Sequence, residues 1–177
     1  MTTKIAKGTI EEVMGQMPYG LYIIGSKSDV DVNGMMADWV MQVSFNPRLI
    51  AVALENDAHT LDNVQAFRHF TVNFLSSDNE SVQLAAKFAQ PYFGSKIKGR
   101  DREAALQVHR KLDDVEYRAA DSGCPVLAQA IAWLDCEAQT FVPIGDHTLV
   151  IGRVMDGGIL KDAESLTSNY TGWTYSG

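Results

Sequence analysis

The sequence of 177 residues contains few cysteines and no long hydrophobic segment. Cys124 and Cys136 do not have a zinc-binding spacing, so we expect free thiols in a reducing compartment, with a redox pair as the alternative. No apolar run approaches the ~20 residues that a membrane-spanning helix needs. Residues 1–8 lack the apolar core of a signal peptide, and we therefore expect a cytoplasmic protein without a membrane partner.

The chain has fewer basic than acidic residues. It contains 15 Lys and Arg against 22 Asp and Glu, which gives a formal net charge of -7 at pH 7. Proteins that bind nucleic acids usually carry clustered positive charge, so this balance argues against a nucleic-acid partner. The negative net charge is compatible with a small basic pocket that binds a single phosphate.

Several motifs of common enzyme classes are also absent. The sequence has no Gly-x-Gly-x-x-Gly motif, no P-loop and no Gly-x-Ser-x-Gly motif. No histidine lies three or four residues from another His or Cys, so local spacing predicts no metal site and leaves only one assembled from distant residues. The histidines are His59, His69, His109 and His147.

The hydrophobic patterns that are present favour strands over helices. Thr9–Glu12 has the pattern of a capping box, which opens a helix that ends near Gly15 to Pro18. Thr60–Phe67 and Ser77–Ala89 have the pattern of helices. A Gly-Asp turn at 145–146 between two apolar runs predicts a hairpin. The predicted strands are Leu21–Gly25, Leu49–Leu54, Phe70–Leu75, Ala128–Val142 and His147–Met155.

The order of these elements predicts a mainly β fold. Ser26–Gly34 has the composition of a turn, and the basic stretch 91–110 predicts a loop followed by a short helix over 102–110. Strands and helices do not alternate as in parallel α/β proteins, so we expect one domain over 1–177 built on a small antiparallel barrel with helical additions. Its core spans about 18–157.

The segment from Asn33 to Phe45 is the first candidate for a ligand site. A polar turn leads into a strand that mixes apolar and polar residues. A flat aromatic ligand that lies against a strand needs small side chains and exposed main-chain N–H and C=O groups, which this segment supplies. The alternative is an ordinary barrel strand with Trp39 in the core.

Two further segments carry polar residues in apolar surroundings. Asn73 lies inside the strand 70–75 and needs hydrogen-bond partners there, either from a ligand or from the protein itself. Ser76 and Ser77 precede a helix, where they either cap it or leave its N–H groups for an anion. His147 enters a strand at a hairpin tip and either lines a pocket or lies half-exposed.

Four of these segments, in this order, resemble the flavin reductase-like, FMN-binding split-barrel family. Residues 33–39 (NGMMADW) resemble its Asn-Gly-Met-Thr-Ala-Ser-Trp signature, and residues 42–47 (QVSFNP) resemble the Gln-Val-Ser-Phe-Asp-Pro that follows. Residues 70–75 (FTVNFL) resemble its Phe-x-Val-Asn-x-Leu strand. Residues 145–154 resemble its Gly-Asp-His segment. The similarity runs from about Pro18 to Val154.

The resemblance implies a six-stranded Greek-key barrel that forms a homodimer and binds FMN, or FAD, near the dimer interface. It implies an NAD(P)H-dependent flavin reductase in which hydride passes from nicotinamide to flavin, with an oxygenase or redox protein as a further partner. His147 would orient NAD(P)H without acting as a general acid. The implied flavin-binding residues are Asn33, Met35, Met36, Ala37, Asp38, Trp39, Val40, Ser44, Asn73, Phe74, Leu75, Ser76 and Lys87.

The chain departs from the family signature at Met36 and Asp38, where the family has Thr and Ser. Because a carboxylate beside a phosphate is unfavourable, we expect Asp38 to point away from the phosphate or to pair with a Lys or Arg. Two other functions share the fold: an FMN-carrying electron-transfer protein, and a barrel that has lost flavin. The residues that could neutralise the phosphate are Lys87, Lys96, Lys98 and Arg100.

The end of the chain, residues 165–177, is rich in aromatic residues. Tyr170, Trp173 and Tyr175 lie within six positions. Because a solvated tail seldom carries three large aromatic residues, we expect this tail to pack, either on its own barrel or across a dimer interface.

Overall fold

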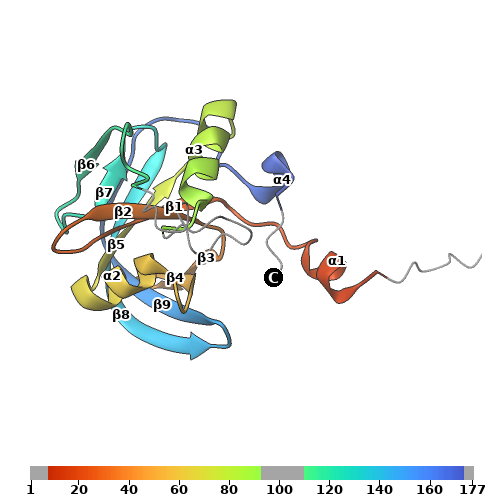
Figure 1. Cartoon of the computed structure of the whole chain (residues 1–177), viewed down its shortest axis with the longest axis horizontal. Helices are drawn as coiled ribbons and strands as arrows, with labels where there is room; N and C mark the ends of the chain where they lie inside the picture. The colour runs from red at the N-terminus through yellow and green to blue at the C-terminus, as the bar shows by residue number, and fades with distance from the viewer. Residues whose placement is uncertain (1–7, 93–109, 174–177) are drawn as a thin grey trace, which may run out of the picture.

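The computed structural model describes residues 8–92 and 110–173 of the chain. Its strands form a curved antiparallel sheet with helices at its margins (Figure 1). The predicted helix at 102–110, apart from Arg110, and Tyr175 lie outside the described residues. In chain order the elements are α1 (Ile10–Met14), β1 (Tyr22–Lys27), β2 (Val32–Ala37), β3 (Val40–Phe45), β4 (Arg48–Glu55), α2 (His59–Phe67), β5 (His69–Phe74), α3 (Asn79–Ala89), β6 (Tyr117–Ala119), β7 (Pro125–Leu127), β8 (Ala132–Ile144), β9 (His147–Ile159) and α4 (Ser168–Thr171).

The main sheet has seven strands in the order β2-β1-β5-β8-β9-β4-β3, and all of its pairs are antiparallel. Its two edge strands, β2 and β3, are separated along the chain by only Asp38 and Trp39. Because two residues span so short a distance, the sheet must curl until its edges meet. The expected barrel is therefore confirmed, and its seam lies at Asp38 and Trp39.

The barrel has one strand more than expected, because the segment 32–45 forms two strands. The predicted turn at 26–34 is also shorter than the sequence suggested. The Ser28 N–H donates to the carbonyl of Asp31 at 2.7 Å, and the Ser28 hydroxyl accepts from Asp31 N–H at 3.0 Å. These bonds close the turn within four residues, so Asn33 and Gly34 belong to β2.

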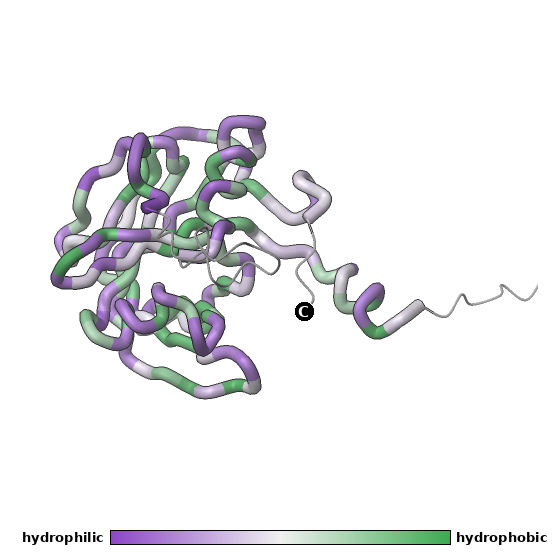
Figure 2. The backbone as a smooth tube through the Cα atoms, viewed as in Figure 1, coloured by the Kyte–Doolittle hydropathy of each residue, from purple (hydrophilic) through white to green (hydrophobic). Residues whose placement is uncertain are grey.

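Both faces of β1 are buried, which explains its continuous apolar sequence. Ile24 belongs to the core cluster inside the barrel, whereas Ile23 belongs to a second cluster beneath α3. The two side chains point to opposite faces because successive residues of a strand alternate. Along most of the remaining chain, hydrophobic and hydrophilic residues alternate over short distances (Figure 2).

The second core cluster joins α3 and the end of the chain to the barrel. Phe88 on α3 is 1% exposed and packs so close to β2 that a Cβ on Gly34 would lie 2.8 Å from its ring. Leu166 is buried in the same cluster, and Trp173 packs against it. Trp173 therefore packs on its own barrel, whereas Tyr170 is 50% exposed.

The capping-box helix and the Gly-Asp hairpin are confirmed. Thr9 accepts from Glu12 N–H, Glu12 accepts from Thr9 N–H, and the short α1 extends away from the barrel (Figure 1). Gly145 has φ 62°, in the left-handed region that glycine adopts without strain. One short hairpin, β6-β7, was not expected, because three residues per strand are too few to show alternation.

Both cysteines are buried free thiols. Burial raises the pKa of Cys124 to about 11 and that of Cys136 to about 12, so neither is a reactive thiolate at neutral pH. No helix in the described ranges is long and apolar enough to cross a membrane.

Candidate functional site

A cleft of about 570 Å³ opens where the barrel seam meets α2 and the end of α3. Its size is in the range of small-molecule sites. Seven of the predicted site residues line it: Asn33, Met35, Met36, Ala37, Asp38, Trp39 and His147. The remaining lining residues are Ala53, Glu55, Asp57, Ala58, His59, Thr60, Phe88, Ala89, Gln90, Pro91, Tyr92 and Lys111.

One wall of the cleft is an edge strand with exposed main chain. β2 pairs with β1, and no other strand in the described residues pairs with its second side. In an antiparallel pair, the main-chain groups of successive residues point alternately toward and away from the partner strand. Ser28 N–H bonds to the Asp31 carbonyl at the turn, and counting along the register from this pair places the main-chain groups of Met36 on the side that faces away from β1. Met36 lines the cleft, so an N–H and a C=O are available to a ligand there.

The chain corner after β2 brings an aromatic pair into the cleft. The rings of Trp39 and His147 lie with their centroids 4.7 Å apart at an angle of 40°. Trp39 also accepts a main-chain hydrogen bond of 3.0 Å from Ala53 N–H on β4. His147 is 7% exposed, which supports the pocket-lining interpretation over a half-exposed turn histidine.

Asn56 fixes the hairpin tip that carries His147. Its Nδ2 donates to the Gly145 carbonyl at 3.2 Å, its Oδ1 accepts from the Thr148 hydroxyl at 2.8 Å, and its N–H donates to the Asp146 carbonyl at 2.9 Å. The His147 Nδ1 lies 2.7 Å from Asp146 Oδ1. Asn56 thus holds the turn, and Asp146 contacts the histidine ring. The contact with His147 lowers the pKa of Asp146.

Asp38 lies on the cleft wall next to this aromatic pair. Burial raises the pKa of its carboxyl group, and main-chain hydrogen bonds at Asp38 and Trp39 together with the charge of His147 act in the opposite direction. The expected pairing with a Lys or Arg is not formed within the described part of the chain, where no such ion pair involves Asp38. The one charged side chain that lowers its pKa is His147.

A different set of side chains surrounds the other part of the cleft. The rings of His59 and Tyr92 stack with centroids 3.8 Å apart at 14°, and Tyr92 Oη donates to Asp31 at 3.2 Å. Lys111 Nζ donates to the Phe88 carbonyl at 3.0 Å. Burial lowers the pKa of His59. The charges of Asp62 and Asp31 oppose this shift, and the charge of Lys111 acts in the same direction as burial.

Asn73, a predicted ligand residue, is fully buried behind the cleft wall and makes only protein contacts in the described structure. Its Nδ2 donates to the carbonyls of Ile23 and Pro125, each at 3.2 Å, and its Oδ1 accepts from Leu127 N–H at 2.8 Å. Nδ2 also lies 3.3 Å from the Thr71 hydroxyl. These bonds join β1, β5 and β7. The protein itself therefore supplies the hydrogen-bond partners of Asn73, which was the alternative to a ligand contact.

The other predicted flavin-binding residues also do not line the cleft. The Ser76 hydroxyl bonds to Asp78, and Asp78 caps α3 by accepting from Ser81 N–H at 2.8 Å, so neither serine is the cap. Lys87 donates to the Asp113 carbonyl. The remaining members of this group are Val40, Ser44, Phe74 and Leu75, and the candidates Lys96, Lys98 and Arg100 lie outside the described residues.

Sequence reasoning missed the residues that enter the cleft from α2, α3 and the segment after them. His59 follows the predicted strand 49–54, and so does Asn56, which supports the hairpin tip and does not line the cleft. A run of polar residues directly after a buried strand was the available signal. Lys111 and Tyr92 had no such signal, because their place depends on how distant segments pack.

No set of three or more His, Cys, Asp and Glu side chains in residues 8–92 and 110–173 is arranged to hold a metal ion.

Comparisons with known proteins identify one family. The sequence model of the flavin reductase-like domain matches residues 14–174. The ferric-chelate reductase (NAD(P)H) of Archaeoglobus fulgidus is 30% identical over 88% of this chain and 85% of its own length. The structure of the flavin reductase PheA2 is similar with a TM-score of 0.68 and 30% identity, covering 88% of each chain.

Some similar proteins are much longer. The diflavin flavoprotein A 1 of Synechocystis sp. is 31% identical over 90% of this chain, but the match covers 25% of that protein. The chain thus spans about a quarter of the length of this relative.

Proposed function

Because the chain belongs to the flavin reductase-like domain family, we propose that it binds FMN in the cleft and transfers hydride from NAD(P)H to the flavin. FAD is the alternative flavin. The observation that carries this proposal is the meeting of an open main-chain edge on β2 with the Trp39–His147 pair in one cleft.

The residues of the cleft fit a flavin in shape and chemistry. A tricyclic ring needs a flat wall with small side chains, and Ala37 and Ala53 both line the cleft. It needs hydrogen-bond donors and acceptors at its polar edge, which the main chain of Met36 supplies. When bound, the flavin supplies the hydride acceptor, so the protein's task is to place two rings against each other.

His147 is proposed to orient the nicotinamide. Its ring is buried against Trp39 and fixed by Asp146, while Asn56 holds the turn that carries it. Such a side chain limits the positions that a second ring can take above the flavin. Since hydride transfer requires no proton from this residue, its contribution is geometric.

An absorbance spectrum tests the proposal directly. We expect purified protein that is titrated with FMN to bind it, and NADH or NADPH to bleach the bound flavin under anaerobic conditions. A protein that neither binds flavin nor oxidises NAD(P)H in the presence of added flavin would contradict the proposal.

An FMN-carrying electron-transfer protein is the second candidate. It is favoured by the similarity to the diflavin flavoprotein, of which this chain spans only a part. Stopped-flow mixing separates the two functions. Slow bleaching by both nicotinamides together with fast reduction by a redox protein would favour the carrier.

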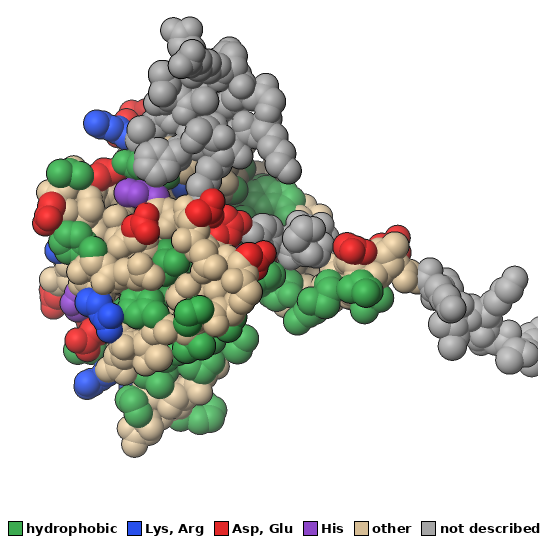
Figure 3. Space-filling model, turned by 60° about the horizontal axis from the view of Figure 1, so that its bottom comes forward, with side chains coloured by type: hydrophobic (Ala, Val, Ile, Leu, Met, Phe, Trp, Pro, Cys, Tyr) green, Lys and Arg blue, Asp and Glu red, His purple; other side chains and the backbone are tan. Residues whose placement is uncertain are grey.

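A homodimer and an oxygenase or redox-protein partner remain predictions, as does a cytoplasmic location. The homodimer is supported by the surface of β3, an edge strand on which Met41 is 63%, Val43 46% and Phe45 87% exposed. Hydrophobic side chains gather over much of one side of the barrel (Figure 3). Light scattering of the wild type and of F45D would detect a dimer that depends on this strand.

A further inference from the structure

We propose that Asp38 makes the Trp39–His147 end of the cleft selective for a positively charged ring, the oxidised nicotinamide of NAD(P)+. This inference rests on the proposed function and names a residue that determines the charge preference of the nicotinamide position. The family signature has Ser where this chain has Asp38, so the negative charge is a property of this chain and not of the signature.

Asp38 is held in the tight corner between β2 and β3. Its carbonyl accepts from Val40 N–H at 2.9 Å, and the carbonyl of Trp39 accepts from Ala53 N–H on β4 at 3.0 Å. These two bonds fix the main chain of the corner against β4. Asp38 and Trp39 both line the cleft, so their side chains enter it from a fixed piece of main chain.

The corner lies beside the hairpin tip that carries His147. The ring of Trp39 is 4.7 Å from that of His147 between centroids. Glu55 on β4 is the cross-strand partner of His147 on β9. Opposite residues of an antiparallel pair have Cβ atoms about 4.5–5.5 Å apart. The corner, β4 and β9 therefore bring Asp38, Glu55 and His147 to one end of the cleft, which all three line.

The carboxylate of Asp38 is not balanced by a Lys or Arg. It forms no ion pair within residues 8–92 and 110–173, and His147 is the side chain whose charge acts on it. Burial raises the pKa of Asp38, because the loss of surrounding water disfavours the charged form of a carboxyl group. A cation that binds beside this carboxylate would compensate for the lost water.

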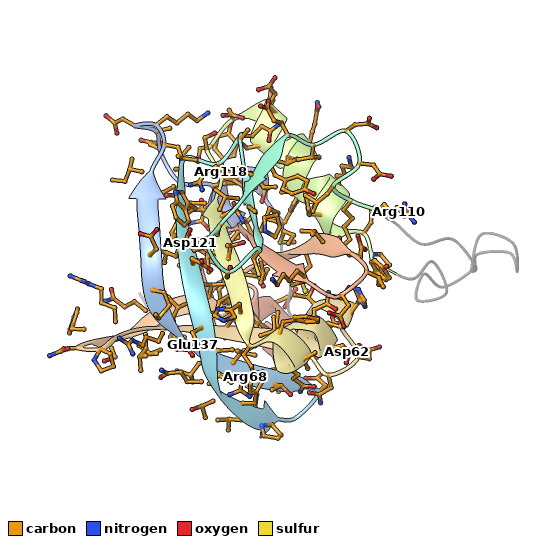
Figure 4. The ribbon with its side chains drawn as sticks, turned by 90° about the vertical axis from the view of Figure 1, so that its left-hand side faces the viewer. Asp62, Arg68, Arg110, Arg118, Asp121 and Glu137 are labelled. Atoms are coloured by element: carbon orange, nitrogen blue, oxygen red, sulfur yellow. The ribbon has the colours of Figure 1, made fainter. Side chains whose placement is uncertain are left out.

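Lys and Arg side chains of the described residues do not line this end of the cleft. Lys111 is the one Lys or Arg among the described lining residues, and it bonds to a carbonyl at the end of α3 in the other part of the cleft. Arg68 and Arg118 each lie over an aromatic ring of β8, outside the cleft (Figure 4). Among these residues, the charge nearest to a ring bound beside His147 is thus the carboxylate of Asp38 or Glu55.

The charge of the nicotinamide ring changes in the proposed reaction. When the reduced ring gives up hydride, the electron pair of the breaking carbon–hydrogen bond leaves with the hydrogen to the flavin, and the ring keeps one positive charge. The oxidised ring is therefore a cation, whereas the reduced ring is uncharged. A fixed carboxylate beside the ring position attracts the oxidised ring and has little effect on the reduced one.

The test compares two nucleotides that differ in ring charge and do not react with oxidised flavin. They are NAD+ and tetrahydronicotinamide adenine dinucleotide, an analogue with an uncharged ring. Calorimetric titration in excess FMN measures their affinities for the wild type, D38N, D38S and E55Q. D38N keeps the size of the side chain, and D38S introduces the residue of the family signature. The control D121N removes one negative charge at an exposed position outside the cleft (Figure 4).

We expect the wild type to bind NAD+ more tightly than the uncharged analogue. D38N and D38S should lower the affinity for NAD+ about three- to twentyfold, because two unit charges attract each other across the cleft and the partly exposed Asp38 is screened by water and salt. The affinities for the analogue and for FMN should stay within about twofold. E55Q should have a smaller effect, and D121N none. Added salt should reduce the preference of the wild type but not that of D38N.

Three results would overturn the role of Asp38. One is equal affinity of the wild type for the two nucleotides, which needs no variant and is decisive even if the variants fail to fold. Another is an equal loss of both nucleotides in a D38N that unfolds at the wild-type temperature or above, which would make Asp38 only a structural part of the corner. The third is an unchanged ratio of the two affinities in D38N and D38S, whatever E55Q does. A wild type that binds FMN but neither nucleotide would contradict the proposed reaction with NAD(P)H as well.

Discussion

Two segments that match the family's sequence pattern carry a polar side chain in or beside an apolar strand: β2 with the corner after it, and β5. In β2 and the corner after it, main-chain groups and Asp38 face the cleft. In β5, every polar atom of the Asn73 side chain bonds to the protein itself. A polar residue in a strand thus marks either a ligand wall or an internal junction, and the sheet edge distinguishes them.

The edge position of β2 is the physical cause of this difference. An edge strand has one row of main-chain groups without a strand partner, whereas β5 lies between β1 and β8 and has none to spare. Asn73 instead satisfies main-chain groups of Pro125 and Leu127, which belong to the short strand β7 that packs over it. Both strands match the family pattern, but β2 has main-chain groups open to a ligand, whereas β5 uses Asn73 to hold β7 in place.

The largest expected effect is the loss of stability in N73A. Removing this side chain leaves the buried Leu127 N–H without its acceptor and takes one of two donors from the Pro125 carbonyl, so we expect a loss of about 3–5 kcal/mol in the free energy of unfolding, measured with urea. N169A, at an exposed position, should change it by less than about 0.5 kcal/mol. A stable N73A with weakened flavin binding would make β5 a ligand wall and remove the distinction.

A second test replaces the tryptophan at the corner after β2. W39A should weaken flavin binding about ten- to a hundredfold, because it removes a large flat side chain from the cleft wall. The matched control is W133A at Trp133, which is buried outside the cleft under Arg118. It should lower stability while the folded fraction binds flavin normally, as fluorescence titration at low temperature will show. Equal losses of affinity would contradict the assignment.

The histidine at the hairpin tip should affect turnover and not flavin binding. H147A should reduce kcat/KM for NAD(P)H about tenfold or more and change FMN affinity by less than about twofold, since its role is to position the second ring. H69A alters a histidine outside the cleft and should leave both values unchanged. If H147A lost FMN affinity as strongly as W39A, His147 would belong to the flavin wall.

The smallest expected effect concerns Asp38 and pH. Because burial raises the pKa of its carboxyl group in the folded protein, Asp38 favours folding when protonated and loses this contribution as the pH rises through the folded-state pKa. D38N should therefore have a higher Tm than the wild type at pH 7, and the difference should shrink on acidification. D162N, at an exposed position, should show no such trend. A difference that grew at low pH would exclude burial as the cause.

Local signals in the sequence were sufficient for several elements. The capping box at Thr9 and Glu12 and the Gly145–Asp146 turn depend on contacts over one to four residues, and both formed as expected. The strand 49–54 was recognisable because its apolar run is bounded by polar residues. The order of four short motifs also placed the chain in its family, which implied the barrel.

The tertiary structure alone decided which residues meet in the cleft. Lys111 contacts Phe88 across 23 positions, and Asn56 contacts Gly145 across 89. Neither pairing leaves a local pattern, because each depends on how the sheet curls and where α3 ends. The sequence by itself determined the short turns, most of the strands and the segment around Trp39 as a ligand candidate, whereas the curl of the sheet made β2 its edge. Long-range packing determined that Asn73 is an internal junction and that a buried lysine faces the cleft, since burial and partner distance arise only after distant segments pack together.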